Sequence, residues 1–393
     1  MSTDDESLDM SLPWSVGELP FFFRHTEVPS NAQYGLPDRL PFLLDADRET
    51  GLIRQPFNKG IETTLDLAYR QGSILSGAMD STGIGQRYAL DFLAYIEAAT
   101  PAMGGRRILE IGSGTGYLLS LLRDRGADVM GIEPGPQGDN TETRFGIKTV
   151  RGFFPSGQIS GNFDVVIAYG VLEHLSDPGG LLREIKKQLA PQGIIILAVP
   201  DCEPYLQAGD LSCLIHEHWS YFTADSLEAV VRQEGFSVAI AQAGFGGVLY
   251  CSASLSEGKG KVSVRADGIP LLTSYRAKSI RMLSRLANLL SSAKKERKSI
   301  GVYVAGRLLN ALSLIGNGET TSDLRFFDDN EALHGKYFPG FSAPVEDWGE
   351  FLNHPPDIVL IASNTFGHKI RARIEEAVDS RIVAWDDLYD RNL

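Results

Sequence analysis

The stretch His216-Glu217-His218 puts two imidazoles around a carboxylate, and these residue types can move protons near neutral pH. In one interpretation a histidine of this stretch is a general base, and the adjacent carboxylate steers it. In a second, His216 and His218 share one face of a strand as metal ligands, but the sequence offers no third ligand beside them, so we expect no metal. In a third, the polar cluster only ties a loop to the sheet.

A glycine-rich turn stands earlier in the chain, in Ile-Leu-Glu-Ile-Gly-Ser-Gly-Thr-Gly-Tyr-Leu-Leu at residues 108–119. The apolar run around Glu110 predicts a buried strand, and residues 117–123 predict the helix that follows it. The glycines of the turn are Gly112, Gly114 and Gly116. They let the backbone approach a ligand closely, and free N–H groups at the helix start can face its polar atoms. Glu133 ends the next strand, where a carboxylate can bind a ribose diol.

The composition of the chain limits the class of protein to which it can belong. With 393 residues, of which 43% are hydrophobic and 22% charged, we expect a globular protein of two or three domains. The net charge of −13 argues against nucleic-acid partners. No apolar run approaches the roughly 18 residues of a membrane span, and the acidic amino terminus does not resemble a secretory signal. Three cysteines form no disulfide framework, so we expect a cytoplasmic protein.

The order of elements predicts an α/β fold. Apolar strands alternate with helices through the middle of the chain, which is typical of a doubly wound, Rossmann-like parallel sheet with its ligand site at the carboxyl ends of the strands. A second, smaller Rossmann-like unit follows. The expected parts are an irregular, substrate-facing segment at 1–80, a cofactor domain at 81–255, a linker with an amphipathic helix at 256–298, and a carboxyl-terminal domain at 299–393.

The order strand, Glu-x-Gly-x-Gly-x-Gly, helix, strand, Glu resembles the cofactor half of class I S-adenosylmethionine-dependent methyltransferases. The resemblance implies S-adenosylmethionine as cofactor, with Glu110 facing its methionine moiety and Glu133 its ribose. Residues 169–178 resemble the segment that family places beside the methionine end, although His174 within it is expected to be an inert helix-start residue. The aromatic residues expected to line the cofactor are Phe153, Phe154 and Tyr169.

The segment His-Glu-His-x-Ser-Tyr-Phe-Thr after Val-Pro-Asp is similar to the sugar C-methyltransferases of deoxysugar biosynthesis, which act on nucleotide-linked 4-keto sugars. This resemblance implies that His218 is the general base, that Glu217 supports it, and that Tyr69 belongs to the catalytic site. It also implies that the carboxyl-terminal domain helps to hold a nucleotide-sugar. The residues expected to bind that substrate are His216, Tyr221, Arg307 and Asn364.

The chain departs from that family in three places. The usual amino-terminal Cys-x-x-Cys pairs are missing, Ile215 stands where a tyrosine is common, and Gln71 replaces the second of two tyrosines. From the resemblance our hypothesis is methyl transfer to a sugar carbon beside a ketone, whereas these departures favour an oxygen acceptor. A sugar O-methyltransferase using the same base is the alternative, and a non-enzymatic protein that keeps the cofactor fold is a lesser one. The expected partner is a small molecule, and the sequence does not indicate an oligomeric state.

Overall fold

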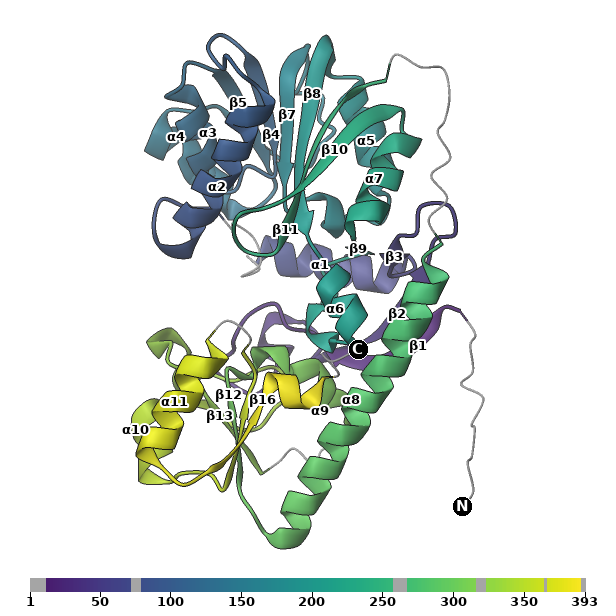
Figure 1. The fold of residues 1–393 in the computed structure, drawn as a ribbon. Helices are drawn as coiled ribbons and strands as arrows, with labels where there is room; N and C mark the ends of the chain where they lie inside the picture. Colours follow the sequence, from purple (N-terminus) through teal and green to yellow (C-terminus); the bar gives the residue numbers. More distant parts are fainter. Residues whose placement is uncertain (1–11, 72–78, 257–266, 316–322, 364–365, 390–393) are drawn as a thin grey trace. The chain divides into compact units, whose positions relative to one another are not determined.

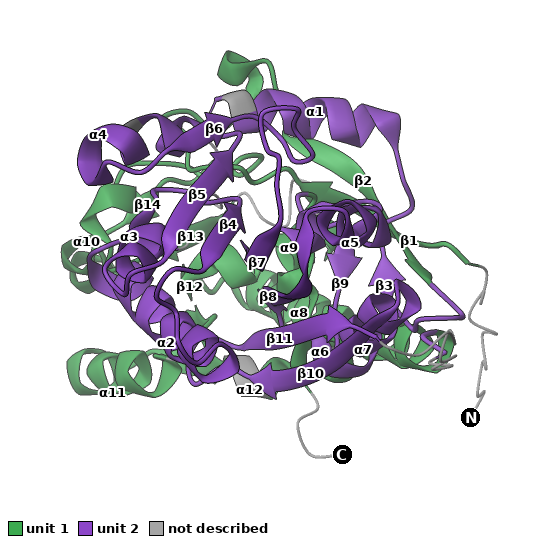
Figure 2. Ribbon diagram, turned by 90° about the horizontal axis from the view of Figure 1, so that it is seen from above, with its two compact units in different colours: residues 1–46, 204–216, 269–393 green, residues 47–203, 217–268 purple. Residues whose placement is uncertain are grey.

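A computed structural model gives the fold of the chain (Figure 1). It describes residues 12–71, 79–256, 267–315, 323–363 and 366–389. The chain forms two compact units, coloured separately in Figure 2. Unit 1 comprises residues 1–46, 204–216 and 269–393, and unit 2 comprises residues 47–203 and 217–268. The chain therefore passes between the units several times, and the units do not follow the four ranges expected from the sequence one for one.

Unit 2 is built on a sheet with the strand order β10-β11-β8-β7-β4-β5-β6. The strands from β8 to β6 are parallel, whereas β10 and β11 run antiparallel to their neighbours. Their bounds are β4 (Arg107–Ile111), β5 (Asp128–Glu133), β6 (Thr149–Arg151), β7 (Phe163–Tyr169), β8 (Leu189–Pro200), β10 (Phe236–Gln242) and β11 (Val248–Leu255). This arrangement, with a second parallel sheet in unit 1, confirms the predicted fold class.

Helices cover both faces of the sheet of unit 2 (Figure 1). Val165 and Ile167 of β7 pack in the core shared with α2 (Gly83–Ala99) and α3 (Tyr117–Arg123). Their neighbours Val166 and Ala168 pack on the opposite side, in the core shared with α5 (Pro178–Lys186) and α7 (Ala224–Gln233). Because successive side chains of a strand point to opposite faces, both sides of β7 are buried over residues 165–168, which explains the apolar run Val-Val-Ile-Ala.

The start of unit 2 holds more regular structure than its polar, Pro- and Gly-rich composition suggests. Helix α1 (Lys59–Arg70) begins after Asn58, whose side chain accepts hydrogen bonds from two backbone N–H groups of the first turn. Strand β3 (Ile53–Arg54) pairs antiparallel with β9 (Ser220–Tyr221). This long-range pairing fixes the chain directly after residues 217–219. The short helix α4 (Thr141–Phe145) completes the unit.

Unit 1 contains a parallel sheet with the order β14-β13-β12-β15-β16. Its strands are β12 (Ile300–Tyr303), β13 (Leu324–Phe327), β14 (Val345–Glu346), β15 (Ile358–Ile361) and β16 (Arg381–Ala384). An antiparallel pair, β1 (Trp14–Pro20) with β2 (Arg39–Ala46), belongs to the same unit. Its helices are α6 (Glu203–Ala208), α8 (Ile269–Glu296), α9 (Leu309–Ile315), α10 (Trp348–Asn353), α11 (Gly367–Ala377) and α12 (Trp385–Leu388).

Helix α8, expected from the sequence to link two domains, is packed into unit 1. Its buried stripe includes Leu272, Tyr275, Met282 and Leu286, at the three- and four-residue spacing of one helix face. The Tyr275 hydroxyl donates to the carbonyl of Asp210, 3.2 Å away, within the same unit. No helix in the part of the chain that the structure describes is both long and apolar enough to cross a bilayer.

Candidate active site

The glycine turn joins β4 to α3 with a backbone that favours glycine. Gly112, Gly114 and Gly116 have φ angles of 72°, 52° and 78°, all in the left-handed region. A Cβ atom at residue 116 would lie 2.2 Å from the Cγ2 atom of the buried Thr141. The turn therefore has the tight, left-handed backbone expected of a glycine-rich ligand-binding loop, and a side chain at residue 116 would not fit.

Two carboxylates lie beside this turn. Glu110 is fully buried, and among the described residues neither of its carboxylate oxygens has a hydrogen-bond partner. Burial raises the pKa of Glu110 well above its usual range, and the nearby charge of Glu133 raises it further. Burial also raises the pKa of Glu133, although the backbone N–H groups of Gly114 and Gly135 donate to its carboxylate at 2.9 and 2.6 Å. The pair therefore favours a cationic ligand group.

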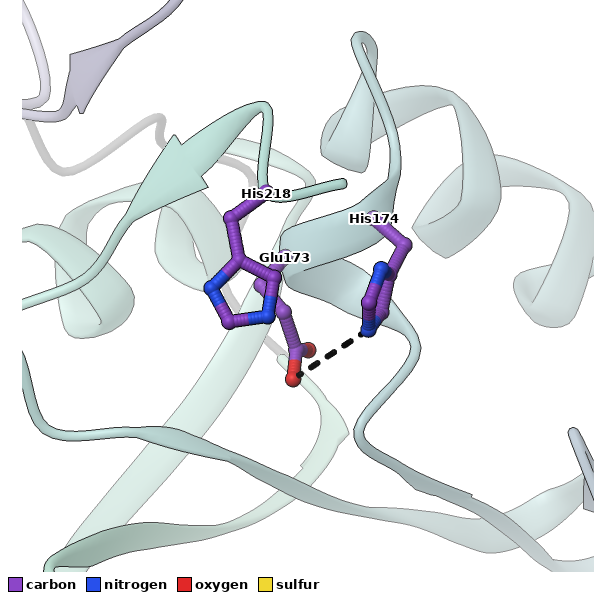
Figure 3. A group of neighbouring side chains, drawn as sticks. All are labelled: Glu173, His174 and His218. Atoms are coloured by element: carbon purple, nitrogen blue, oxygen red, sulfur yellow. Dashed lines mark ion pairs between the residues drawn. The ribbon is translucent and has the colours of Figure 1, made fainter. Parts of the chain in front are cut away.

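A second group of side chains gathers where η3 (Leu172–His174) follows β7 (Figure 3). The rings of His174 and His218 meet edge to face, with centroids 4.8 Å apart. The Tyr69 hydroxyl from α1 lies 3.1 Å from Nδ1 of His174, and Nδ1 also lies 3.0 Å from the backbone carbonyl of Glu217. A carbonyl oxygen can only accept, so Nδ1 of His174 carries the proton and Nε2 keeps its lone pair.

Burial changes the acid–base behaviour of this group. It lowers the pKa of His174 to about 4 and raises that of Glu173 to about 8. It lowers the pKa of His218 well below its usual range, and the neighbouring His174 lowers it further. The pKa of Tyr69 is raised by burial first, then by the charge of Glu217 and a hydrogen bond to it. At neutral pH both imidazoles are therefore neutral.

The structure brings several residues predicted as site residues into this one group. Tyr69, Glu217 and His218 lie together, and the buried ring of Tyr221 is 6.4 Å from that of His218. The carboxylate of Glu217 is hydrogen-bonded to the Tyr69 hydroxyl, and its carbonyl accepts from His174. Glu217 therefore organises the residues around His218.

His216 lies elsewhere. It belongs to unit 1, where its ring packs edge to face against Phe21 and Phe42, at centroid distances of 5.8 and 5.1 Å. Its Nε2 atom lies 3.2 Å from the carbonyl oxygen of Leu40, and burial lowers its pKa to about 4. These contacts are those of a core histidine with a satisfied ring nitrogen, so the two histidines of the triplet do not act as a pair.

Of the other two residues predicted to bind substrate, Arg307 also belongs to unit 1. It ends η5 (Ala305–Arg307), where Nη2 lies 3.4 Å from the Tyr205 hydroxyl and the guanidinium stands 5.7 Å from the centre of that ring. Asn364 lies outside the described residues.

The aromatic residues predicted beside the cofactor differ in their surroundings. Phe153 follows β6 and is 66% exposed, whereas Phe154 packs against the core that contains α5 and α7. Tyr169 ends β7 and packs against Phe92 of α2, with ring centroids 5.0 Å apart. Phe153 is therefore the aromatic side chain of the three that most readily offers a free face to a ligand.

The sequence analysis assigned no role to Glu173 and treated His174 as inert. Both follow the carboxyl end of β7, on the segment whose sequence resembles the one that the family places beside the methionine end. The available signal was topological, because the ends of parallel strands meet at one edge of a sheet. His218 also comes to this edge, since the N–H of its neighbour Trp219 donates to the Glu173 carbonyl at 2.8 Å, although 43 residues of chain lie between His174 and His218.

Residues 36–239, more than half of the chain, match the methyltransferase domain family. The chain belongs to this family. Residues 263–383 of the methyltransferase match the C-methyltransferase C-terminal domain. Together with the glycine turn and its two carboxylates, these matches identify a class I methyltransferase that depends on S-adenosylmethionine.

Individual relatives of the methyltransferase differ in how much of it they cover. It is 25% identical over 287 residues to the C-methyltransferase NovU of Streptomyces niveus, covering 68% of each chain. It is 35% identical over 104 residues to the ubiquinone biosynthesis O-methyltransferase of Azorhizobium caulinodans, covering 24% of this chain and 40% of that one. A solved S-adenosylmethionine-dependent methyltransferase of Mesorhizobium loti aligns over 41% of this chain and 96% of its own, at 16% identity and a TM-score of 0.35.

The residues around the turn fit S-adenosylmethionine. A buried carboxylate without a partner is costly, and an ammonium group is the ligand group that satisfies it. Glu110 would hold the amine of the methionine moiety with this carboxylate, and Glu133 would hold the ribose hydroxyls. When bound, S-adenosylmethionine supplies a methyl group on a sulfonium, which leaves as a thioether.

Proposed function

We propose that this methyltransferase transfers the methyl group to a carbon of a nucleotide-linked sugar, beside a ketone, with His218 as the general base. The observation that carries the proposal is the group formed by Tyr69, His174, Glu217 and His218 in the unit that also holds the glycine turn. The match of residues 263–383 and the similarity to the NovU C-methyltransferase support carbon as the acceptor atom.

In this mechanism each side chain has a separate task. His218 takes the proton from the carbon beside the ketone, and the electron pair that remains forms the new bond to the methyl carbon. Glu217 holds the Tyr69 hydroxyl with its carboxylate and the His174 ring with its carbonyl. His174 packs edge to face on His218 and limits the positions of its ring. Fixing the base in this way lowers the entropic part of the barrier.

A sugar hydroxyl is the alternative acceptor. His218 can remove the proton of a hydroxyl by the same geometry, and similarity over about a quarter of the chain to a ubiquinone biosynthesis O-methyltransferase supports this alternative. The two reactions differ in the proton that is lost, because only carbon methylation requires the removal of a C–H proton.

Proton exchange separates the two functions. The methyltransferase is incubated in D2O with S-adenosylhomocysteine, which carries no transferable methyl group, and a panel of nucleotide-linked 4-keto sugars. We expect deuterium at the carbon beside the ketone, measured by NMR and mass spectrometry. The His218→Gln variant should lose about 100-fold or more of this exchange rate, in line with the usual contribution of a general base. The exposed His368→Ala change is the control.

A second measurement identifies the product. With methyl-labelled S-adenosylmethionine, carbon methylation gives a C–CH3 signal and oxygen methylation gives an O–CH3 signal in the NMR spectrum. Methylation without prior C–H exchange, and an O–CH3 product, would establish the alternative. Unchanged exchange and transfer in His218→Gln would remove His218 as the base.

A further inference from the structure

Glu173, His174 and His218 form a compact group with the donor atoms of a metal site (Figure 3). One ligand atom from each residue can be chosen so that all lie within 4.8 Å of one another. The donors are a carboxylate oxygen and two imidazole nitrogens. Of the His-Glu-His triplet only His218 takes part, and the fold supplies the other two ligands, because Glu173 and His174 of η3 come to the same place as residue 218.

The surrounding hydrogen bonds orient these groups toward one another. Nδ1 of His174 donates to the Glu217 carbonyl, so Nε2 carries a lone pair and faces Glu173, whose Oε1 atom is 4.0 Å away. A backbone carbonyl that fixes the other ring nitrogen is the usual outer partner of a metal-bound histidine. Hydrogen bonds also fix the main chain at Glu173 and His218. The N–H of Trp219 donates to the carbonyl of Glu173 at 2.8 Å, and the side-chain amide of Gln55 donates to the carbonyl of His218 at 2.6 Å.

A second observation points to a missing ligand. Glu173 is 3% exposed, and its buried Oε2 atom has no hydrogen-bond partner among the described residues. The 4.0 Å separation between Oε1 and Nε2 of His174 is too long for a hydrogen bond. Buried polar atoms are almost always satisfied, so a carboxylate in this state requires an explanation. A cation between Glu173 and the two imidazoles provides one.

We propose that Glu173, His174 and His218 bind one divalent transition-metal ion, with Zn2+ the best match. Two imidazoles and one carboxylate are donors that favour Zn2+ and similar ions over Mg2+ or Ca2+, which prefer oxygen ligands. Bonds of about 2.1 Å in a tetrahedral site separate ligands by about 3.4 Å, so modest side-chain rotations close the group around the ion. Three protein ligands leave the fourth position open.

Occupancy of this site has a consequence that rests on the proposed function. The ion takes the lone pair of one His218 nitrogen and holds the ring against Glu173. A base so engaged cannot accept the acceptor's proton, so the bound ion should inhibit deprotonation. The site is thus a point at which metal availability regulates the methyltransferase.

Metal binding is tested on the full-length chain without an affinity tag, after treatment with a chelator. Titration with Zn2+ alone, followed by calorimetry and by metal content after dialysis, should give one ion per chain. Titration with Co2+ should give visible absorption bands of a four-coordinate site. The Glu173→Gln and His218→Gln variants should bind Zn2+ at least about tenfold more weakly. His368→Ala, a change at an exposed histidine, should bind it normally.

Unaltered affinity for S-adenosylmethionine shows that each variant is folded, so a lost metal site is not confused with a lost structure. Absence of stoichiometric binding, or normal binding in both ligand variants, would overturn the metal site. Deuterium exchange with and without Zn2+ is measured separately. Zn2+ that binds through these residues and leaves exchange unchanged would sustain the metal site and refute the assignment of His218 as base.

Discussion

Glu110→Gln should weaken cofactor binding while stabilising the free protein. The side chain keeps its shape but loses the charge that we assign to the amine of S-adenosylmethionine. Hydrogen bonds to charged groups contribute about 1.5–3 kcal/mol, so the dissociation constant should rise by about 10- to 150-fold. Calorimetric titration with S-adenosylmethionine at pH 8 measures this loss.

Although Glu110→Gln weakens cofactor binding, it should increase the stability of the free protein. Because both carboxylate oxygens of Glu110 are buried without a described partner, ionisation of Glu110 in the folded state costs about 1–3 kcal/mol. Its pKa is raised above the reference value of 4.5, so the folded state holds its proton more tightly than the unfolded state. The wild type therefore loses stability as pH rises from about 4.5 toward the folded-state pKa. The glutamine variant lacks this loss.

Urea denaturation of both proteins without cofactor checks the argument. At pH 4 their free energies of unfolding should be nearly equal, and at pH 8 the variant should be more stable by about 1–2 kcal/mol. Glu376→Gln makes the same charge change at an exposed position and should alter neither quantity. A variant that binds S-adenosylmethionine normally, or that is less stable than the wild type at pH 8, would refute the role given to Glu110.

Two further changes test the site. Gly116→Ala places a Cβ atom against the buried Thr141 at a position with a left-handed backbone. The free energy of unfolding of unit 2, measured by urea denaturation, should fall by about 1–3 kcal/mol. The variant should also bind S-adenosylmethionine more weakly. Gly157→Ala is its control, since a Cβ there meets nothing within 4 Å. Tyr69→Phe removes the hydroxyl that contacts His174 and Glu217. The lost hydrogen bond contributes about 1 kcal/mol, so the rate constant of methyl transfer should fall by about fivefold to tenfold. The affinity for the cofactor should not change. An unchanged rate constant of methyl transfer in single-turnover assays would show that Tyr69 has no role in the site.

The cofactor half of the fold was predictable because its signals are local. The strand around Glu110, the three glycines and the acid ending the next strand lie within one βαβ unit, so sequence order fixes their neighbours. The start of helix α7 is a local feature of the same kind, since the Thr223 side chain accepts a hydrogen bond from the backbone N–H of Ser226. A local pattern of this kind can be recognised in the sequence without knowledge of distant contacts.

The partners of His218 were not predictable in the same way. The sequence predicted that His216 binds substrate beside the base His218, but the structure packs the His216 ring against Phe21 and Phe42 in unit 1. The residues that do surround His218 come from α1 and η3, and a long-range strand pairing, β3 with β9, helps to bring them close. Such a pairing leaves almost no trace in the short sequences of either strand.

The interleaved construction of unit 1 affects the order in which the protein can be assembled during synthesis. Glu18 of β1 accepts a hydrogen bond from the Ser313 hydroxyl of α9, 295 residues further along the chain. The strands β1 and β2 must therefore wait for this packing partner until α9 has been synthesised. Their apolar side chains are a natural target for chaperones in that interval, and removal of the last hundred residues would leave this opening segment permanently without its packing partner.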